Sequence, residues 1–382
     1  MSTSVLSSDP VAAPQALPVP ALVRALQLRD LTDPAQGRHA LQLLVDDAAS
    51  ALAALWDCAV EVERSRPVVS LEDNYDRLGY QPDAVARDVR YTRYISTTTM
   101  LRSHTSAGIP PALRRLATGP EQPVLLVLPG ICHRRDAIDR LHTSAPHQLD
   151  LWLLRPGGPR LDHDDLHRMV STLAQTLLPG SHWRWNATTH PYTVGGREVE
   201  AIRDNAPVEI AECGLAAPDV LARCGLDPNR WSGLALGMGL DRLLMLRKHI
   251  PDIRLLRSAD PRIADQMLDL EPYTPVSDLP TARRDLSVAV DADDDAEIIG
   301  DRVREALGTR ADLVEEVSVL SSTPYAELPE AARRRLGIRP GQHNILLRLV
   351  LRPVDRTLSG DEVNELRDLM YAALHRGVAP VS

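Results

Sequence analysis

The stretch from residue 233 to residue 248 constrains the fold of this chain more than any other. It reads Gly-Leu-Ala-Leu-Gly-Met-Gly-Leu-Asp-Arg-Leu-Leu-Met-Leu-Arg-Lys, so small residues lead into an arginine and then into apolar residues spaced three and four apart. The second half of this pattern is typical of a helix with one buried face. The first half lets a ligand approach a strand-to-helix junction closely, beneath the cation of Arg242. The sequence therefore predicts a site for a flat ligand at this junction.

Length and composition are those of an ordinary globular protein. At 382 residues the chain can form two or three domains. Hydrophobic residues make up 44% and charged residues 25%, and no apolar run approaches the roughly 18–20 residues of a membrane span. The four cysteines form no C-x-x-C pair, which argues against a disulfide framework or a zinc site. These features predict a protein of the cytoplasm that does not enter a membrane.

The charge and the aromatic content are less usual. The net charge of −9 excludes a global basic field of the kind that attracts nucleic acid, although a local arginine cluster can still bind RNA. The chain contains no phenylalanine, whereas about ten or more would be ordinary for this length. Leucine, valine and isoleucine must therefore fill the core.

The pattern along the chain divides it into four parts. We predict a flexible leader at 1–20, a helical segment at 21–71, a catalytic domain at 72–271 and a smaller domain at 272–382. Strands and helices do not alternate regularly in the third part, which favours an α+β fold with an antiparallel sheet over a doubly wound one. The β-α-β-β-α order of the last part indicates a ferredoxin-like split sheet.

Short motifs carry candidate chemistry but also admit plain structural interpretations. Arg134 lies in a charge-dense loop after a predicted strand, where its guanidinium can bridge a phosphate or simply face solvent. His104 and Ser106 share one face if they lie on a strand, or they form an ordinary hydroxyl-rich strand end. The sequence has no nucleophile elbow G-x-S-x-G, and Gly237-x-Gly239 lacks the third glycine of a dinucleotide fingerprint.

Taken together, these motifs and their neighbours resemble phenylalanyl-tRNA synthetases of the single-chain, organellar-like type, which are class II synthetases. The similarity covers roughly residues 72–380, in the family's order. The matching blocks are Asp73-Asn-Tyr-Asp76, Leu101-Arg-Ser-His104-Thr-Ser106-Ala, the loop from Gly130 to Asp150, Val208-Glu209-Ile-Ala-Glu-Cys213-Gly214, Gly237 to Leu246 with Asp252-Ile-Arg254, Pro275 to Ser287, and Arg356 to Asn364. Only the first signature motif of the class is hard to place.

The resemblance implies a class II catalytic domain, an antiparallel sheet flanked by helices, followed by a ferredoxin-like anticodon-binding domain. It implies activation of an amino acid with ATP and Mg²⁺ and transfer of the aminoacyl group to tRNA, expected to be tRNA(Phe). Arg134 and Arg242 would be the catalytic cations, and both would bind ATP together with Glu209, Gly237 and Gly239. Glu209 would also hold the magnesium ion. The chain would act as a monomer or a homodimer.

By the same resemblance, residues from several blocks would contact the amino acid. His104, Ser106 and Gln148 would hold its α-amino and carboxyl groups. The full set is His104, Ser106, Gln148, Asp150, His190, Tyr192, Leu234, Ala235 and Leu236. The resemblance also implies that the last domain, which synthetases that bind tRNA retain, contacts tRNA. Its candidate phosphate contacts are Arg283, Arg284 and Arg356.

Departures from the family pattern lie where an aromatic side chain would be recognised. The family's Phe-Pro-Phe is His190-Pro-Tyr192 here, its Phe-x-Phe strand is Leu234-Ala-Leu236, and its glutamate is Asp150. Either the pocket still takes phenylalanine in a chain that has dispensed with that residue, or it takes another, more polar aromatic amino acid. Drift in a paralogue, a non-tRNA acceptor and a non-catalytic, tRNA-binding regulatory role are the remaining alternatives.

Overall fold

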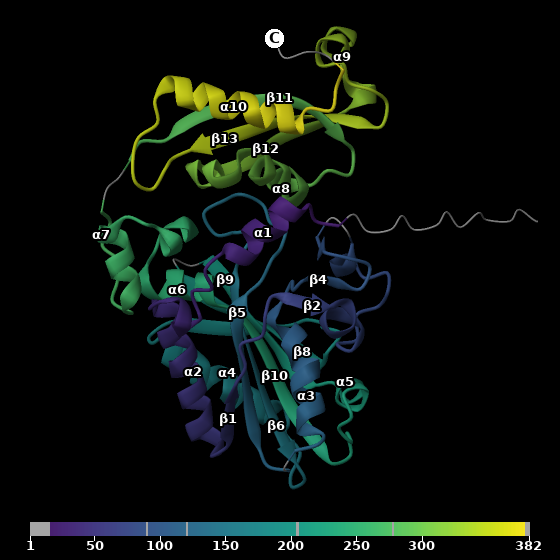
Figure 1. The fold of residues 1–382 in the computed structure, drawn as a ribbon, viewed down its shortest axis with the longest axis vertical. Coiled ribbons are helices and arrows are strands. Elements are labelled where there is room, and N and C mark those ends of the chain that lie inside the picture. The colour runs from purple at the N-terminus through teal and green to yellow at the C-terminus, as the bar shows by residue number, and fades with distance from the viewer. Residues whose placement is uncertain (1–15, 89–90, 120, 204–205, 277–278, 379–382) are drawn as a thin grey trace, which may run out of the picture.

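The computed structural model describes residues 16–88, 91–119, 121–203, 206–276 and 279–378. Most of the predicted leader, residues 1–15, lies outside this part of the chain. Within the described ranges, no helix is both long enough and apolar enough to cross a membrane. Figure 1 shows a larger, strand-rich domain with a smaller domain above it, formed by the C-terminal part of the chain.

The larger domain is built on one seven-stranded sheet. Its strands run in the order β1-β5-β6-β10-β9-β8-β7, and every pair is antiparallel except β1 with β5. The largely antiparallel sheet predicted from the irregular alternation of strands and helices is therefore confirmed. The strands are β1 (Ala59–Val62), β5 (Val124–Ile131), β6 (His147–Pro156), β7 (His182–Ala187), β8 (Thr193–Arg203), β9 (Ala206–Ala216) and β10 (Trp231–Gly239).

Helices cover both faces of this sheet (Figure 1). One face packs against α2 (Ala40–Trp56), α4 (His163–Leu177) and α6 (Leu240–Lys248), in a core that leucine dominates. The other face packs against α3 (Ile109–Leu116) and α5 (Pro218–Arg223). Leucine and other aliphatic side chains thus take the place of phenylalanine, as the composition requires.

The N-terminal part differs in detail from the helical segment predicted at 21–71. It contains α1 (Val19–Gln27) and α2, but it ends in strands, because the alternating residues 59–62 pair with β5. A small second sheet, with the order β2-β4-β3, lies beside the main one. The remaining elements here are β2 (Val68–Ser70), β3 (Arg93–Tyr94), β4 (Thr99–Leu101) and, after α6, α7 (Pro261–Ala264).

The smaller domain is a three-stranded antiparallel sheet with the order β11-β13-β12. The strand that comes last in the chain lies in the centre, as in a split β-α-β unit. Helices α8 and α10 pack on one face and α9 on the other, so the predicted β-α-β-β-α order holds with α9 as an addition. The elements are β11 (Ala282–Asp291), α8 (Ala296–Leu307), β12 (Val314–Pro324), α9 (Glu330–Leu336), β13 (Gln342–Leu351) and α10 (Gly360–Leu374).

Candidate active site

One face of the seven-stranded sheet, which we call the site face, carries most of the predicted site residues. On the two central strands, Asp150 of β6 lies opposite Gly237 of β10, and Trp152 lies opposite Ala235. Because side chains alternate along a strand, Gln148 shares this face with Asp150 and Trp152. The sequence block 146–152 and the glycine-rich junction therefore meet on one surface.

Leu234 and Leu236, which the sequence predicts in the amino-acid pocket, lie on the opposite face. They are only 0% and 2% exposed, in the leucine-rich core that α2 and α4 cover. Ala235 between them is buried in the same cluster as Trp152 and Tyr192. Side chains alternate between the two faces of a strand, so neighbouring residues of one sequence motif point in opposite directions. The structure thus brings Ala235, and not the two leucines, to the other site residues.

Asp150 is the buried carboxylate of the site face, with 2% exposure. Its Oδ2 accepts a hydrogen bond of 2.6 Å from the Thr105 hydroxyl, whereas Oδ1 has no partner among the described residues. Burial raises the pKa of Asp150 to about 6, although hydrogen bonds from Thr105 and Ser106 oppose the shift. A cationic group on a ligand would favour the charged form, so the position suits an ammonium group.

Aromatic rings form a wall beside this carboxylate. Tyr80 stacks on His104 at 5.6 Å between ring centroids, and Tyr192 lies 6.5 Å from Tyr80, 5.8 Å from His190 and 6.2 Å from Trp152. A flat side chain can pack against such a wall. The sequence analysis missed Tyr80 and Trp152. Trp152 lies two positions after Asp150 on β6, so the two side chains share one face of the sheet. That spacing could have indicated Trp152 from the sequence.

His104 and His190 bring polar atoms to this aromatic wall. Burial, with the charge of Arg134, lowers the pKa of His104 to about 3, so its ring is neutral. Its Nδ1 has no hydrogen-bond partner within the described ranges. His190 Nε2 lies 3.3 Å from Glu212 Oε2, and this contact lowers the pKa of the Glu212 carboxyl group. His190 therefore places a polar group where the resemblance has a phenylalanine ring.

Arg134 and Arg242, the two predicted catalytic cations, lie around one carboxylate, that of Glu209. The Nε of Arg134 donates a hydrogen bond of 2.7 Å to the Ser103 carbonyl. Arg242 Nη1 donates to the Glu209 carbonyl at 3.0 Å and lies 3.7 Å from its carboxylate. The positive charges of both arginines act on the Glu209 carboxyl group. Gly239, at the end of β10, has no atom within 4 Å of the place that a Cβ would take, which leaves room for a ligand.

Glu209 belongs to an acidic patch on β8 and β9. Glu212 and Glu198 lie directly opposite each other in the two strands, and Glu200 lies opposite Glu209. Burial, and then the charges of Glu212 and Glu198, raise the pKa of Glu209. A cation bound beside Glu209 would offset these negative charges and favour its ionised form.

The three arginines predicted to bind tRNA lie on the smaller domain, but not on one surface. Arg284 Nε donates to Asn364 at 3.3 Å, and Arg356 forms an ion pair of 2.9 Å with Glu362, so both lie near the first turns of α10. Arg283 is exposed and precedes Arg284 on β11, so its side chain points to the opposite face of that sheet.

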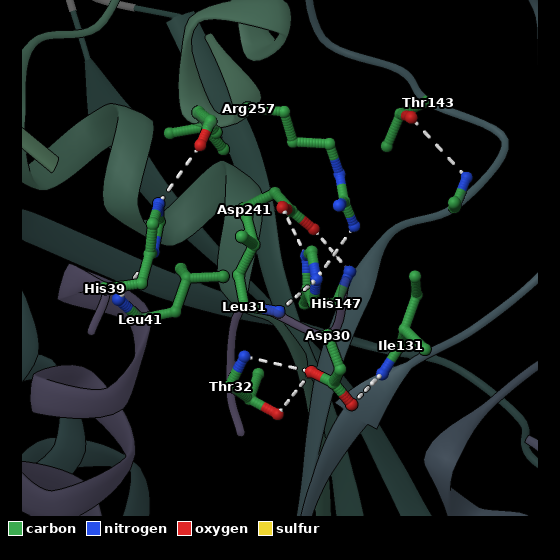
Figure 2. Close-up of polar contacts among 12 residues, drawn as sticks. Asp30, Leu31, Thr32, His39, Leu41, Ile131, Thr143, His147, Asp241 and Arg257 are labelled. Carbon is green, nitrogen blue, oxygen red and sulfur yellow. Dashed lines mark hydrogen bonds and ion pairs between the residues drawn. The ribbon is translucent and has the colours of Figure 1, made fainter. Parts of the chain in front are cut away.

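Behind the site face, a buried polar network ties β6 to α6 and to the N-terminal segment (Figure 2). His147 Nδ1 donates to Asp241 Oδ1 at 2.8 Å, and its Nε2 accepts from the Leu31 amide at 3.1 Å and from Arg257 at 3.0 Å. Asp30 accepts a 3.1 Å hydrogen bond from the amide of the last residue of β5. The network therefore fixes both ends of the loop that carries Arg134, one of the two predicted catalytic cations.

Comparisons with known proteins identify relatives of this chain. A phenylalanine–tRNA ligase alpha subunit of Prochlorococcus marinus is 33% identical over 242 residues, which cover 62% of this chain and 69% of that protein. The chloroplastic/mitochondrial phenylalanine–tRNA ligase of Arabidopsis thaliana is 29% identical over 314 residues, 79% of this chain and 68% of that protein. The match reaches only 56% of the length of two further alpha-subunit relatives.

Among solved structures, a pyrrolysyl-tRNA synthetase of Desulfitobacterium hafniense superposes with a TM-score of 0.44 and 18% identity, over 57% of this chain and 73% of that one. The family described as tRNA synthetases class II core domain (F) matches residues 30–267. This match takes in the whole of the site face and more than half of the chain. The chain therefore belongs to the class II tRNA synthetase core family.

Proposed function

We propose that this chain activates phenylalanine, or a related aromatic amino acid, with ATP and transfers it to tRNA(Phe). The observation that carries the proposal is the grouping of Arg134, Arg242 and Glu209 on the site face of a class II core. The relatives named as phenylalanine–tRNA ligases support the same reaction.

In the first step, a carboxylate oxygen of the amino acid attacks the α-phosphorus of ATP, and pyrophosphate leaves. Negative charge must be held on both reactants, so cations fixed before the reaction lower the barrier. Arg134, held at Nε by the Ser103 carbonyl, would bind the α-phosphate. Arg242, held by the Glu209 backbone, would cover the nucleotide beside Gly237 and Gly239. No general base is needed, because the attacking group is already ionised.

Glu209 would hold Mg²⁺, which when bound neutralises charge on the phosphates. Its pKa is raised by burial and by the charges of Glu212 and Glu198, which outweigh the opposing charges of Arg242 and Arg134, so a bound cation would favour the charged form. Within the described ranges no group of three or more His, Cys, Asp and Glu side chains is placed to hold a metal ion. The protein would therefore supply one or two carboxylates, and the nucleotide and water the remaining ligands, as is usual for magnesium.

Asp150 would receive the α-ammonium group of the amino acid, supported by Ser106 and with Gln148 beside it on β6. Its unpartnered Oδ1 and raised pKa support this role. The side chain of the amino acid would pack on Tyr192, next to Ala235. Because His190 and its Glu212 partner lie at the same wall, a hydroxylated aromatic amino acid is the second candidate substrate.

Transfer to tRNA rests on the smaller domain. Arg283, Arg284 and Arg356 offer exposed or half-buried guanidinium groups for phosphate contacts, on two faces of that domain. An acceptor other than tRNA remains the alternative reaction, and a non-catalytic tRNA-binding protein the alternative from another class. The cytoplasmic location and the choice between monomer and homodimer stay predictions.

ATP–pyrophosphate exchange with a panel of amino acids, including hydroxylated phenylalanines, tests the proposal. We expect exchange with one aromatic amino acid and a loss of roughly 100- to 1,000-fold in Arg134→Ala, because a fixed cation at the developing charge is removed. Arg168→Ala on α4, whose ion pair is at the surface, is the control. Absence of exchange with every amino acid would refute the enzyme. Exchange without charging of tRNA(Phe) would refute the acceptor.

A further inference from the structure

The loop between β5 and β6, residues 132–146, is held by the smaller domain as well as by its own. Arg304 of α8 donates hydrogen bonds to two successive carbonyls of the loop, those of Asp136 and, at 2.7 Å, Ala137. The Val317 amide of β12 donates to the Ile138 carbonyl at 2.9 Å. The Ile138 side chain, 7% exposed, is packed in the hydrophobic core of the smaller domain. The loop is therefore bound through both backbone and side chain.

Asp301 connects the smaller domain to the predicted catalytic cation itself. It pairs with Arg93 of β3 and, at 3.1 Å, with Arg135. Arg93 in turn donates to the carbonyl of Arg134 at 3.3 Å. Asp301 is 8% exposed, so water screens these two ion pairs little. Asp301 of α8 is thus linked to Arg135 directly and to the backbone of Arg134 through Arg93.

Gly300 lets α8 approach the loop this closely. A Cβ at this position would lie 2.8 Å from the Asp136 carbonyl oxygen and 3.2 Å from the Ala137 Cα. Both are backbone atoms and cannot turn away as the end of a side chain could. Figure 1 shows α8 on the side of the smaller domain that faces the larger one. A side chain at this position would therefore force the helix and the loop apart.

A second contact shows that this docking is specific. Glu315 of β12, 1% exposed, pairs with Arg140 of the same loop, with Arg254 at 3.7 Å, and with Arg352 of its own domain. A carboxylate buried this deeply is strongly destabilising without its partners. Two of those three partners, Arg140 and Arg254, belong to the larger domain, so docking supplies most of the positive charge around this buried carboxylate.

We propose that Gly300, Asp301 and Arg304 of the smaller domain are positioning residues for amino-acid activation, and not only part of a tRNA-binding module. They place the loop so that Arg134 meets the α-phosphate in the productive geometry. This inference rests on the proposed function. A displacement of about 1 Å at such a site costs on the order of 100-fold in rate. Formation of the adenylate, which involves no tRNA, therefore depends on a domain outside the catalytic core.

The test compares two glycine substitutions in the full-length chain. Gly300→Ala should lower kcat of ATP–pyrophosphate exchange about tenfold or more, because the new Cβ displaces the loop backbone. Gly360→Ala, at the start of α10, is the matched control, since no atom lies within 4 Å of the place for its Cβ. The KM for the amino acid should change little, because the residues proposed to bind it lie outside the loop.

Asp301→Asn is the second variant, and it introduces no added atom bulk. It should lower kcat in the same way while the thermal unfolding midpoint stays within about 4 °C of the wild type. If Gly300→Ala does not fold, this variant decides. Wild-type kcat in the folded variants, or a loss that only follows the unfolded fraction, would overturn the inference. Failure of the wild-type chain to support exchange would instead refute the proposed function.

Discussion

The two faces of the seven-stranded sheet each have a buried aspartate beside them, and the surroundings of the two differ. On the site face, one oxygen of Asp150 has no partner in the part of the chain that the structure describes, and burial raises its pKa to about 6. On the packed face, burial of Asp241 also opposes ionisation, but the interactions with His147 outweigh it and lower the pKa of Asp241. A carboxylate whose partners all lie in the protein holds the fold. One that lacks a partner is prepared for a ligand.

This difference teaches that burial alone does not identify a site residue. Both aspartates are almost inaccessible, at 2% and 5% exposure. What separates them is whether the protein completes the hydrogen bonding of the group. The same strand, β6, serves both: His147 turns to one face and Asp150 to the other, because residues at odd and even positions alternate.

The largest effect is expected on stability, from a substitution that breaks the polar network around His147 and Asp241. Asp241→Ala should lower the free energy of unfolding by about 3–5 kcal/mol, because it removes both hydrogen bonds to His147 and leaves the buried Arg257 with less compensation. Urea denaturation measures this change. Asp265→Ala, at an exposed position, is the control and should change stability by less than about 0.5 kcal/mol. A small effect at Asp241 would mean that the network is not a structural support.

The next effect tests which face Leu236 belongs to. Leu236→Ala should lower the free energy of unfolding by about 3 kcal/mol, because it leaves a cavity beneath the sheet. The specific exchange activity of the folded variant should stay near that of the wild type. An altered KM for the amino acid at unchanged stability would contradict the structure. It would instead support the sequence-based prediction that Leu236 contacts the amino acid.

The smallest effect concerns Asp150 and pH. Since its folded-state pKa is about 6, above the ordinary 3.8, protonation between pH 7 and pH 5 should lower kcat/KM for the amino acid about tenfold. A raised folded-state pKa contributes stability below pH 4 that is lost as the pH rises through 6. Activity and this part of the stability should therefore change in opposite directions. In Asp150→Asn both pH dependences should disappear, and their persistence would assign them to another group.

Much of this molecule follows from local patterns in the sequence. The β-α-β-β-α order of the smaller domain is visible in the spacing of its apolar residues, and the structure confirms it. The blocks around Arg134, Glu209 and Arg242 come together because each lies in a strand of the same sheet or directly after one. Tyr80 is different: it belongs to the aromatic wall only because a separate turn brings it onto His104, and no spacing in the sequence indicates that contact.

The sequence by itself determined the class II core, the cations of the site face and an aliphatic core without phenylalanine, since these depend on residue type and on short-range periodicity. The tertiary structure alone decided that Ala235 faces the site while Leu234 and Leu236 face the core. It alone showed that Asp150 Oδ1 has no hydrogen-bond partner among the described residues, whereas both carboxylate oxygens of Asp241 contact His147. It also placed Asp301 and Arg304 against the loop of Arg134. These outcomes depend on strand register and on contacts between residues more than 90 positions apart, which no local pattern encodes.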